Sequence, residues 1–171
     1  MVDALVGFLE TLRDSPYALR LLVVFCVSLL PGIGGPATTI PIGYFVLGLH
    51  IPVVTVICIM GNLIPVPFIV LFIRVIFDWM RKISKLFGRI ADKFEEKASS
   101  KGQRLQKGVF VGLMLYVAIP IPLPGMGAWT AALIAGIFNI KLKTAYPAIA
   151  LGVLIASTIT ILGMLGVIAM M

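Results

Sequence analysis

The sequence predicts an all-α polytopic membrane protein, built as an inverted repeat of a re-entrant helical hairpin followed by a transmembrane helix. Three observations predict it: an apolar composition, long stretches without charge, and two proline- and glycine-rich breaks at corresponding positions. Hydrophobic residues make up 60% of the chain and charged residues 12%, against about 45–50% and about 25% in a soluble domain. This composition excludes a soluble enzyme, a nucleic-acid binder and a disulfide-stabilised scaffold.

Long uncharged stretches show where the chain can enter a membrane. No Asp, Glu, Lys or Arg occurs in residues 21–73, 108–140 or 144–171. Each stretch is longer than the ~20 residues that a helix needs to cross the hydrocarbon core. We therefore expect a single membrane domain, residues 1–171, that passes through the cell membrane several times.

The N-terminal segment, residues 1–14, is predicted to form a short amphipathic helix that lies in the membrane interface. Its apolar residues recur at helical spacing, and its charged residues fall on the remaining surface of the helix. Ser15 and Pro16 then end this segment and start the next one.

The first repeat is predicted over residues 17–77. A short helix over 17–30 rises about 21 Å, which is less than the ~30 Å of the hydrocarbon core. It ends at the break 31–36, Pro-Gly-Ile-Gly-Gly-Pro, and a second short helix follows over 37–49. A helix over 51–77 is long enough to cross the membrane, although its internal prolines should bend it.

A basic linker, residues 78–107, separates the two repeats. It holds nine of the fourteen Lys and Arg residues, interleaved with apolar residues at helical spacing. Such a pattern is typical of an amphipathic helix on the cytoplasmic membrane surface. The residues predicted to contact anionic lipid headgroups are Arg81, Lys82, Lys85 and Arg89.

The second repeat, residues 108–171, has the same order of segments. A short helix is predicted over 107–119, a break over 120–127, a short helix over 128–139 and a long one over 143–171. Pro31-Gly-Ile-Gly34 aligns with Pro124-Gly-Met-Gly127, 93 positions later, and the same offset pairs Gly43 with Gly136. A connection two residues shorter then pairs Gly61 with Gly152.

Two orientations of the halves fit this pattern. Either every short helix before a break spans the membrane and the halves are parallel, or each pair of short helices is a re-entrant hairpin and the halves are inverted. Counting Lys and Arg on the inner side does not separate them. Helix length favours the inverted repeat, because about fourteen residues suit a hairpin arm better than a full span.

The two breaks are predicted to meet near the middle of the membrane and to form a substrate pathway. Non-helical backbone is tolerated at this depth only where it is buried in protein or lines a cavity. The helix starts beyond the breaks offer free N–H groups, which suit an anion or a phosphate headgroup. The predicted pathway residues are Pro31, Gly32, Gly34, Gly35, Thr38, Thr39, Asn62, Pro124, Gly125, Gly127, Trp129 and Thr130.

Structural roles compete with these assignments. The breaks can be purely architectural, Asn62 can cap freed carbonyls instead of contacting a substrate, and Trp129 can be buried by packing. Arg74 is expected to extend to the cytoplasmic interface. Close helix contacts are expected at Gly108-x-x-x-Gly112, Ala131-x-x-x-Ala135 and Gly152-x-x-x-Ala156.

No enzyme, metal site or cofactor is predicted. All seven acidic residues lie in the N-terminal segment or the basic linker, so the membrane segments hold no carboxylate that could carry a proton or a cation. No catalytic triad, zinc-ligand spacing or phosphate-binding loop occurs. His50 lies in a short connection, where a solvated side chain is expected.

Three strings resemble a known family, the small multidrug export proteins, distantly related to the DedA/VTT membrane proteins. They are Gly61-Asn-Leu-Ile-Pro-Val-Pro-Phe68 with Phe77-Asp-Trp79, then Pro122-Leu-Pro-Gly-Met-Gly-Ala-Trp-Thr130, and Pro147-Ala-Ile-Ala-Leu-Gly152. The resemblance implies two inverted re-entrant hairpins, each followed by a transmembrane helix, and it points to lipid movement across bilayers. Many members carry Glu and Arg in the first break, where this chain has Gly34 and Pro36, which argues against ion coupling through those charges.

Three functions remain open from the sequence. The first is a transporter that moves an anionic lipid or a small amphiphile past the two breaks. The second is a proton-coupled multidrug exporter, and the third is a non-transporting scaffold whose basic linker binds anionic lipids or partners. The expected partners are the bilayer, anionic lipids and a second copy of the chain, and no nucleic acid.

Overall fold

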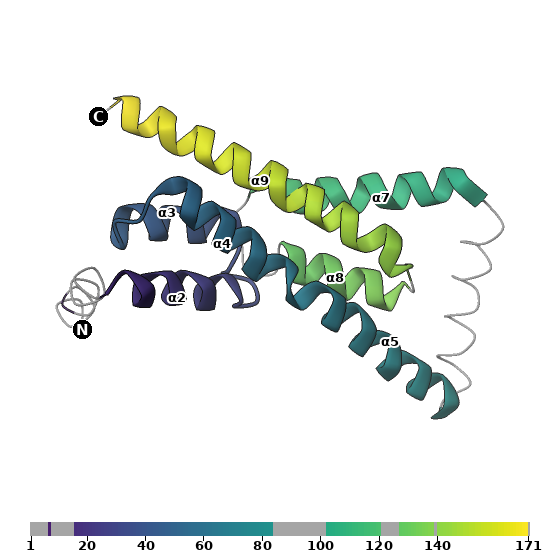
Figure 1. Cartoon of the computed structure of the whole chain (residues 1–171). Helices are drawn as coiled ribbons and strands as arrows, with labels where there is room; N and C mark the ends of the chain where they lie inside the picture. Colours follow the sequence, from purple (N-terminus) through teal and green to yellow (C-terminus); the bar gives the residue numbers. More distant parts are fainter. Residues whose placement is uncertain (1–6, 8–15, 84–101, 121–126, 139, 171) are drawn as a thin grey trace.

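The computed structural model describes residues 7, 16–83, 102–120, 127–138 and 140–170, with side chains outside 77–107. Within these ranges the regular structure is entirely helical (Figure 1). The predicted N-terminal helix, most of the basic linker and the middle of the second break therefore lie outside the described residues.

The first half begins with two short helices separated by the first break. Helix α2, Tyr17–Ser28, is followed by a turn, and helix α3, Pro36–Pro41, begins at a proline in its first position. Proline suits a helix start because the N–H that it lacks would have no partner there. A π-helical turn, η1, Ile42–Val46, directly follows Pro41. The predicted short helix over 37–49 is thus an α-helical piece followed by a π-helical one.

The long helix of the first half consists of two parts. Helix α4, Ile51–Leu63, and helix α5, Pro65–Ile83, are separated only by Ile64, whose φ of −56° and ψ of −47° are helical. The apolar part, Ile51–Ile76, is long enough to cross a membrane. Pro52 lies in the first turn and Pro65 at the start of α5, where each is tolerated.

The second half contains helix α7, Gly102–Ala118, helix α8, Ala128–Ile137, and helix α9, Leu142–Met170. Helix α9 is the second helix of the described chain that is long and apolar enough to cross a membrane. The helices next to the breaks are apolar but shorter, over Tyr17–Ser28, Gly108–Ala118 and Ala128–Ile137. The alternation of short and long helices predicted from the sequence is present in the structure.

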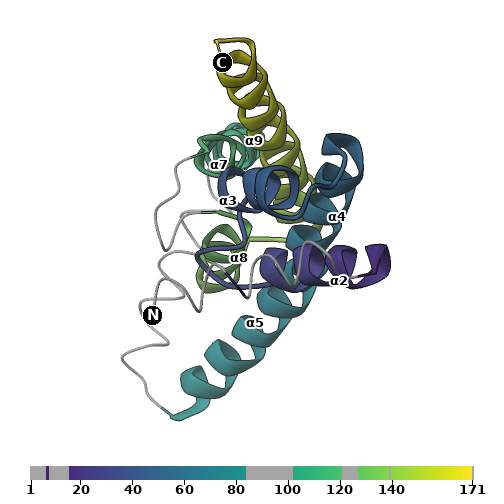
Figure 2. The ribbon, with the colours of Figure 1, turned by 90° about the vertical axis from the view of Figure 1, so that its left-hand side faces the viewer.

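The two pairs of short helices have opposite directions, and the described edges of the second break lie next to the first break. In Figure 1 the chain runs from the left end to the middle along α2 and back along α3, whereas α7 runs from the right end to the middle and α8 returns. Figure 2 shows α3 and α7 nearly end-on, so their axes have almost the same direction. Helix α3 contacts α9, and α8 contacts α5, so each second arm packs on the long helix of the other half.

Glycines allow each long helix to approach the first arm of its own half. A Cβ atom on Gly61 of α4 would lie 1.7 Å from Oγ of Ser28 in α2. A Cβ atom on Gly152 of α9 would lie 2.6 Å from Cβ of Val117 in α7. The two glycines that the sequence alignment pairs thus have corresponding packing roles.

Two of the three predicted small-residue motifs pack inside the chain. Ala131 and Ala135 of α8 are buried, and so are Gly152 and Ala156 of α9. The third, Gly108 and Gly112 of α7, is exposed, with open space where a Cβ atom would be.

Candidate functional site

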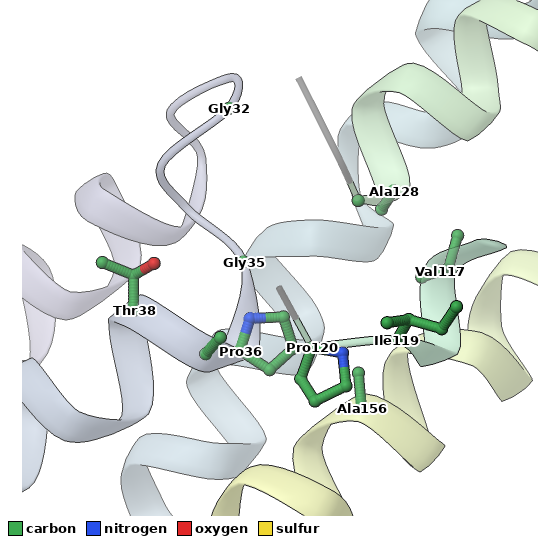
Figure 3. A pocket seen from close by; sticks show the side chains of 11 residues that line it. Gly32, Gly35, Pro36, Thr38, Val117, Ile119, Pro120, Ala128 and Ala156 are labelled. Carbon is green, nitrogen blue, oxygen red and sulfur yellow. The ribbon is translucent and has the colours of Figure 1, made fainter. Parts of the chain in front are cut away.

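One small cavity lies where the two breaks meet, near the middle of the molecule. The first break and the start of α3 contribute one side, the residues on both sides of 121–126 contribute the other, and α9 closes it. The lining residues are Gly32, Gly35, Pro36, Ala37, Thr38, Val117, Ile119, Pro120, Gly127, Ala128 and Ala156. Figure 3 shows the rings of Pro36 and Pro120 next to each other, close to Ala156.

The cavity is small and almost entirely apolar. Its volume is about 20 Å³, which is room for roughly one water molecule. Among the described lining residues, Thr38 is the only one with a polar side chain, and none carries a charge.

The first break is fixed by hydrogen bonds to the carbonyl oxygen of Gly34. Nδ2 of Asn62 donates to this oxygen over 2.8 Å, and Oγ1 of Thr39 donates to it over 3.0 Å. All three residues are buried. A buried carbonyl outside a helix needs such donors, because an unpaired one would be strongly destabilising.

A model of a protein family matches most of the chain. The model described as "putative small multi-drug export protein" matches residues 37–159 of the chain. The chain belongs to this family. Comparisons of the chain with curated proteins and with solved structures found no match. The family description, together with the two helices that are long and apolar enough to cross a membrane, indicates a membrane protein.

The family match also covers most of the cavity. It begins at Ala37, inside the lining of the cavity, and it extends beyond Ala156, the last lining residue. Asn62 and the described part of the second break lie within it, whereas Gly32, Gly34 and Gly35 precede it. The hydrogen bonds of Asn62 and Thr39 thus connect the matched region to the carbonyl of Gly34.

The structure divides the predicted pathway residues into three groups. Gly32, Gly35, Thr38 and Gly127 line the cavity. Gly34, Thr39 and Asn62 form the buried hydrogen-bonded support of the first break, and in this arrangement Asn62 caps a freed carbonyl. The others are Pro31, which is exposed, Trp129 and Thr130, which are partly buried in the first turn of α8, and Pro124 and Gly125, which lie outside the described residues.

The start of α8 has one unusual polar group. Nε1 of Trp129 is buried and has no hydrogen-bond partner among the described residues. Trp129 does not line the cavity itself, although its neighbour Ala128 does. The N-cap residue Gly127 has a φ of +126° and a ψ of −165°, a conformation that is essentially restricted to glycine.

Sequence reasoning missed most of the apolar wall and one role of a charged residue. Pro36, Ala37, Val117, Ile119, Pro120, Ala128 and Ala156 line the cavity without having been predicted. Pro36 and Pro120 belong to the predicted breaks, whereas the others have apolar side chains that give no chemical signal, and only the packing of the halves reveals them. Arg74, expected to extend to the interface, donates from Nη2 to the carbonyl oxygen of Ile140. The predicted headgroup residues Arg81, Lys82, Lys85 and Arg89 lie where no side chains are described.

Proposed function

We propose that this chain is a multi-pass transporter of the cell membrane that moves an anionic lipid or a small amphiphile past the junction of its two breaks. One observation carries the proposal: segments about ninety positions apart, with the same Pro-Gly-x-Gly string, line a single cavity. Facing breaks in two halves of a membrane protein are the usual position of a transport site. The apolar lining suits the acyl chains or apolar body of an amphiphile.

The opposed directions of the two helix pairs support an inverted repeat of re-entrant hairpins. Helices α2 and α3 open toward one end of the molecule and α7 and α8 toward the other (Figure 1). If α4–α5 and α9 cross the bilayer, each hairpin enters from a different side and ends near the midplane. Because the cavity holds about one water molecule, transport requires the hairpins to separate at their tips.

The main test uses Gly35, which lines the cavity in an ordinary backbone conformation. Its φ is −68°, and a Cβ atom there would meet nothing within 4 Å, so the backbone accepts a side chain at this position. We expect Gly35→Leu to fold normally and to lose most of the flux of a fluorescent phospholipid in proteoliposomes. Gly163→Leu on α9, where a Cβ atom also meets nothing within 4 Å, is the matched control and should keep full flux.

The results separate the transporter from its alternatives. Unchanged lipid flux in Gly35→Leu would contradict the proposal. Dye efflux that requires a proton gradient would favour the drug exporter, although residues 15–77 and 97–171 contain no Asp or Glu that could carry the proton. A function that survives Gly35→Leu but is lost when Lys82, Lys85 and Arg89 become Gln would favour the scaffold.

The inverted orientation has its own test. His50 directly precedes α4 and Lys143 lies in the first turn of α9, and both are exposed, so single cysteines there should be accessible from water. In a background in which Cys26 and Cys58 are replaced, we expect an impermeant maleimide to label only one of the two positions in intact cells. Labelling of both would place the connections on one side and would contradict the inverted repeat.

A further inference from the structure

Two arginines each donate a hydrogen bond to a backbone carbonyl oxygen, one in each half, and the two carbonyls lie at corresponding positions. Nη1 of Arg20 in α2 donates to the carbonyl oxygen of Leu47 over 3.1 Å, and Nη2 of Arg74 in α5 donates to that of Ile140. Leu47 and Ile140 are 93 positions apart, which is the offset that aligns the Pro-Gly strings. The carbonyls correspond, whereas the arginines come from unrelated positions.

Each of these carbonyls lies at the end of a second hairpin arm. Leu47 directly follows η1, and Ile140 lies in the connection after α8. The last carbonyls of a helix lack internal partners and carry the negative end of its dipole, so a cation is favourable there. Capping the carbonyl uses only one N–H donor of each guanidinium group, which has five.

One further donor of each arginine, the Nε–H group, lacks an acceptor. Nε of Arg20 and Nε of Arg74 are buried without a hydrogen-bond partner in the described part of the chain. No carboxylate occurs among the described side chains, because every Asp and Glu lies in residues 3–14 or 78–96. Each guanidinium group therefore has a buried N–H donor that no described residue accepts, and a phosphate oxygen can accept it.

The positions of the two groups indicate which anion is near. Arg20 and Leu47 lie at the open end of the first hairpin and Arg74 and Ile140 at the open end of the second, at opposite ends of the molecule (Figure 1). In the inverted arrangement, on which this inference rests, these ends lie at the two membrane surfaces. Phosphate groups of phospholipids are the abundant anions there, and guanidinium groups bind phosphate in a bidentate manner.

We propose that Arg20 and Arg74 each bind the phosphate of a phospholipid headgroup, one in each leaflet, at the mouth of a hairpin. The bound lipid completes the hydrogen bonding of a guanidinium that also caps the hairpin arm. Lipid binding and hairpin position are thereby coupled. A lipid leaving either site would leave the arginine with an unpaired donor.

The two sites differ in their surroundings, and this predicts different lipid preferences. Lys141 and Lys143, both exposed, lie next to Ile140 and add positive charge to the Arg74 site. The Arg20 site has no neighbouring cation among the described residues and instead has the ring of Tyr17, whose centroid lies 5.7 Å from the guanidinium carbon. The Arg74 site should therefore prefer anionic lipids, and the Arg20 site should accept the phosphate of any phospholipid.

The experiment measures lipid binding on the purified full chain in detergent, with no transport step. Phosphatidylglycerol, phosphatidylcholine or inorganic phosphate is titrated, and bound lipid is read by native mass spectrometry together with the lipid-dependent rise in melting temperature. We expect Arg74→Gln to bind phosphatidylglycerol about tenfold more weakly, because a charge-assisted contact to phosphate is lost. Arg20→Gln should weaken the binding of phosphatidylglycerol and of phosphatidylcholine to a similar extent.

A purely structural role predicts a different result. If the arginines only cap carbonyls, the Gln variants have a lower melting temperature in the absence of lipid. Their lipid-dependent rise in melting temperature would then equal that of the wild type, which would overturn the proposal. Arg20→Lys and Arg74→Lys keep the charge and a capping donor, so they should fold where a Gln variant fails and still bind lipid more weakly than the wild type. Lys143→Gln, which leaves both arginines in place, should reduce only the preference for phosphatidylglycerol.

Inorganic phosphate distinguishes the source of the anion. If free phosphate reproduces the full rise in melting temperature at millimolar concentration and lipid adds nothing, the ligand is not a lipid and the proposal fails. Because binding is measured without flux, a chain that binds lipid at both sites but does not transport it would contradict the proposed function alone. Loss of flux in Gly35→Leu with no lipid bound at either arginine would contradict this inference alone.

Discussion

The two breaks share a Pro-Gly-x-Gly string but have different surroundings. In the first, Gly34 is buried, its carbonyl accepts two side-chain hydrogen bonds, and a Cβ atom would lie 2.5 Å from the carbonyl oxygen of Ser28. In the second, a Cβ atom on the aligned Gly127 would meet nothing within 4 Å, and its φ is +126°. Glycine is required for space at the first break and for backbone conformation at the second.

This difference shows that one motif can serve two purposes in one chain. The first break is built into the protein by contacts with α2, α3 and α4, so it can act as a fixed wall of the cavity. At the described edge of the second break, a Cβ atom on Gly127 would meet no described atom within 4 Å.

The largest expected effect comes from adding a methyl group to the first break. Gly34→Ala places Cβ within 2.7 Å of three carbonyl oxygens, those of Ser28, Val27 and Leu30. Backbone atoms cannot yield as a flexible side chain does, so we expect a loss of about 3 kcal/mol in unfolding free energy. Thermal unfolding of the purified protein in detergent measures it.

The aligned substitution in the second break is the matched comparison. Gly127→Ala meets no atom and carries only the strain of a positive φ, about 1–2 kcal/mol. The variant should therefore be purified in good yield when Gly34→Ala is not. Equal losses of stability in the two variants would show that the breaks are equivalent and would contradict the comparison.

A smaller effect is expected from the hydrogen bonds that support the first break. Asn62→Ala and Thr39→Val each remove one donor to the carbonyl of Gly34, and each should lower the unfolding free energy by about 1 kcal/mol. The double variant leaves that buried carbonyl without either donor, so its loss should exceed the sum of the single losses. Strict additivity, measured in the same thermal assay, would show that the carbonyl finds another partner.

The sequence predicts the helices well and the contacts between them poorly. Proline and glycine act locally, so the breaks, the short helix of α2 and the long helix of α9 follow from composition and spacing alone. The bond between Asn62 and the carbonyl of Gly34 joins positions 28 residues apart, and those of Arg20 and Arg74 join positions 27 and 66 residues apart. Such pairs depend on how α2, α4 and α5 pack, which no local pattern encodes.

The candidate site was predictable only in part for the same reason. The glycines and prolines of the breaks mark where the cavity lies, because backbone that leaves a helix in a membrane needs protein or a cavity around it. The small apolar wall residues, such as Val117 and Ala156, belong to regular helices and differ from their neighbours only in facing the junction. Their role depends on the pairing of the two halves.

The smallest effect on stability is expected at the second break, from Trp129→Phe. Position 129 aligns with Pro36 in the first break, which has no side-chain donor, so the indole N–H is a feature of the second half alone. This N–H is buried without a partner in the described residues, and removing an unpaired donor offsets the packing lost with the smaller ring. We expect a change within about 0.5 kcal/mol in unfolding free energy.

Transport gives the second readout for Trp129, because an N–H donor that has no partner among the described residues and lies beside Ala128 can hydrogen-bond a polar group of the substrate. Flux should then fall in Trp129→Phe while stability is unchanged, and Trp79→Phe, at the only other tryptophan, serves as the control and keeps full flux. The Trp79→Phe protein also leaves Trp129 as the single indole, so its emission should shift when a transported lipid is added. A loss of about 1 kcal/mol or more in Trp129→Phe, with no shift in emission, would mean that the indole has a structural partner and that the second break is as firmly held as the first.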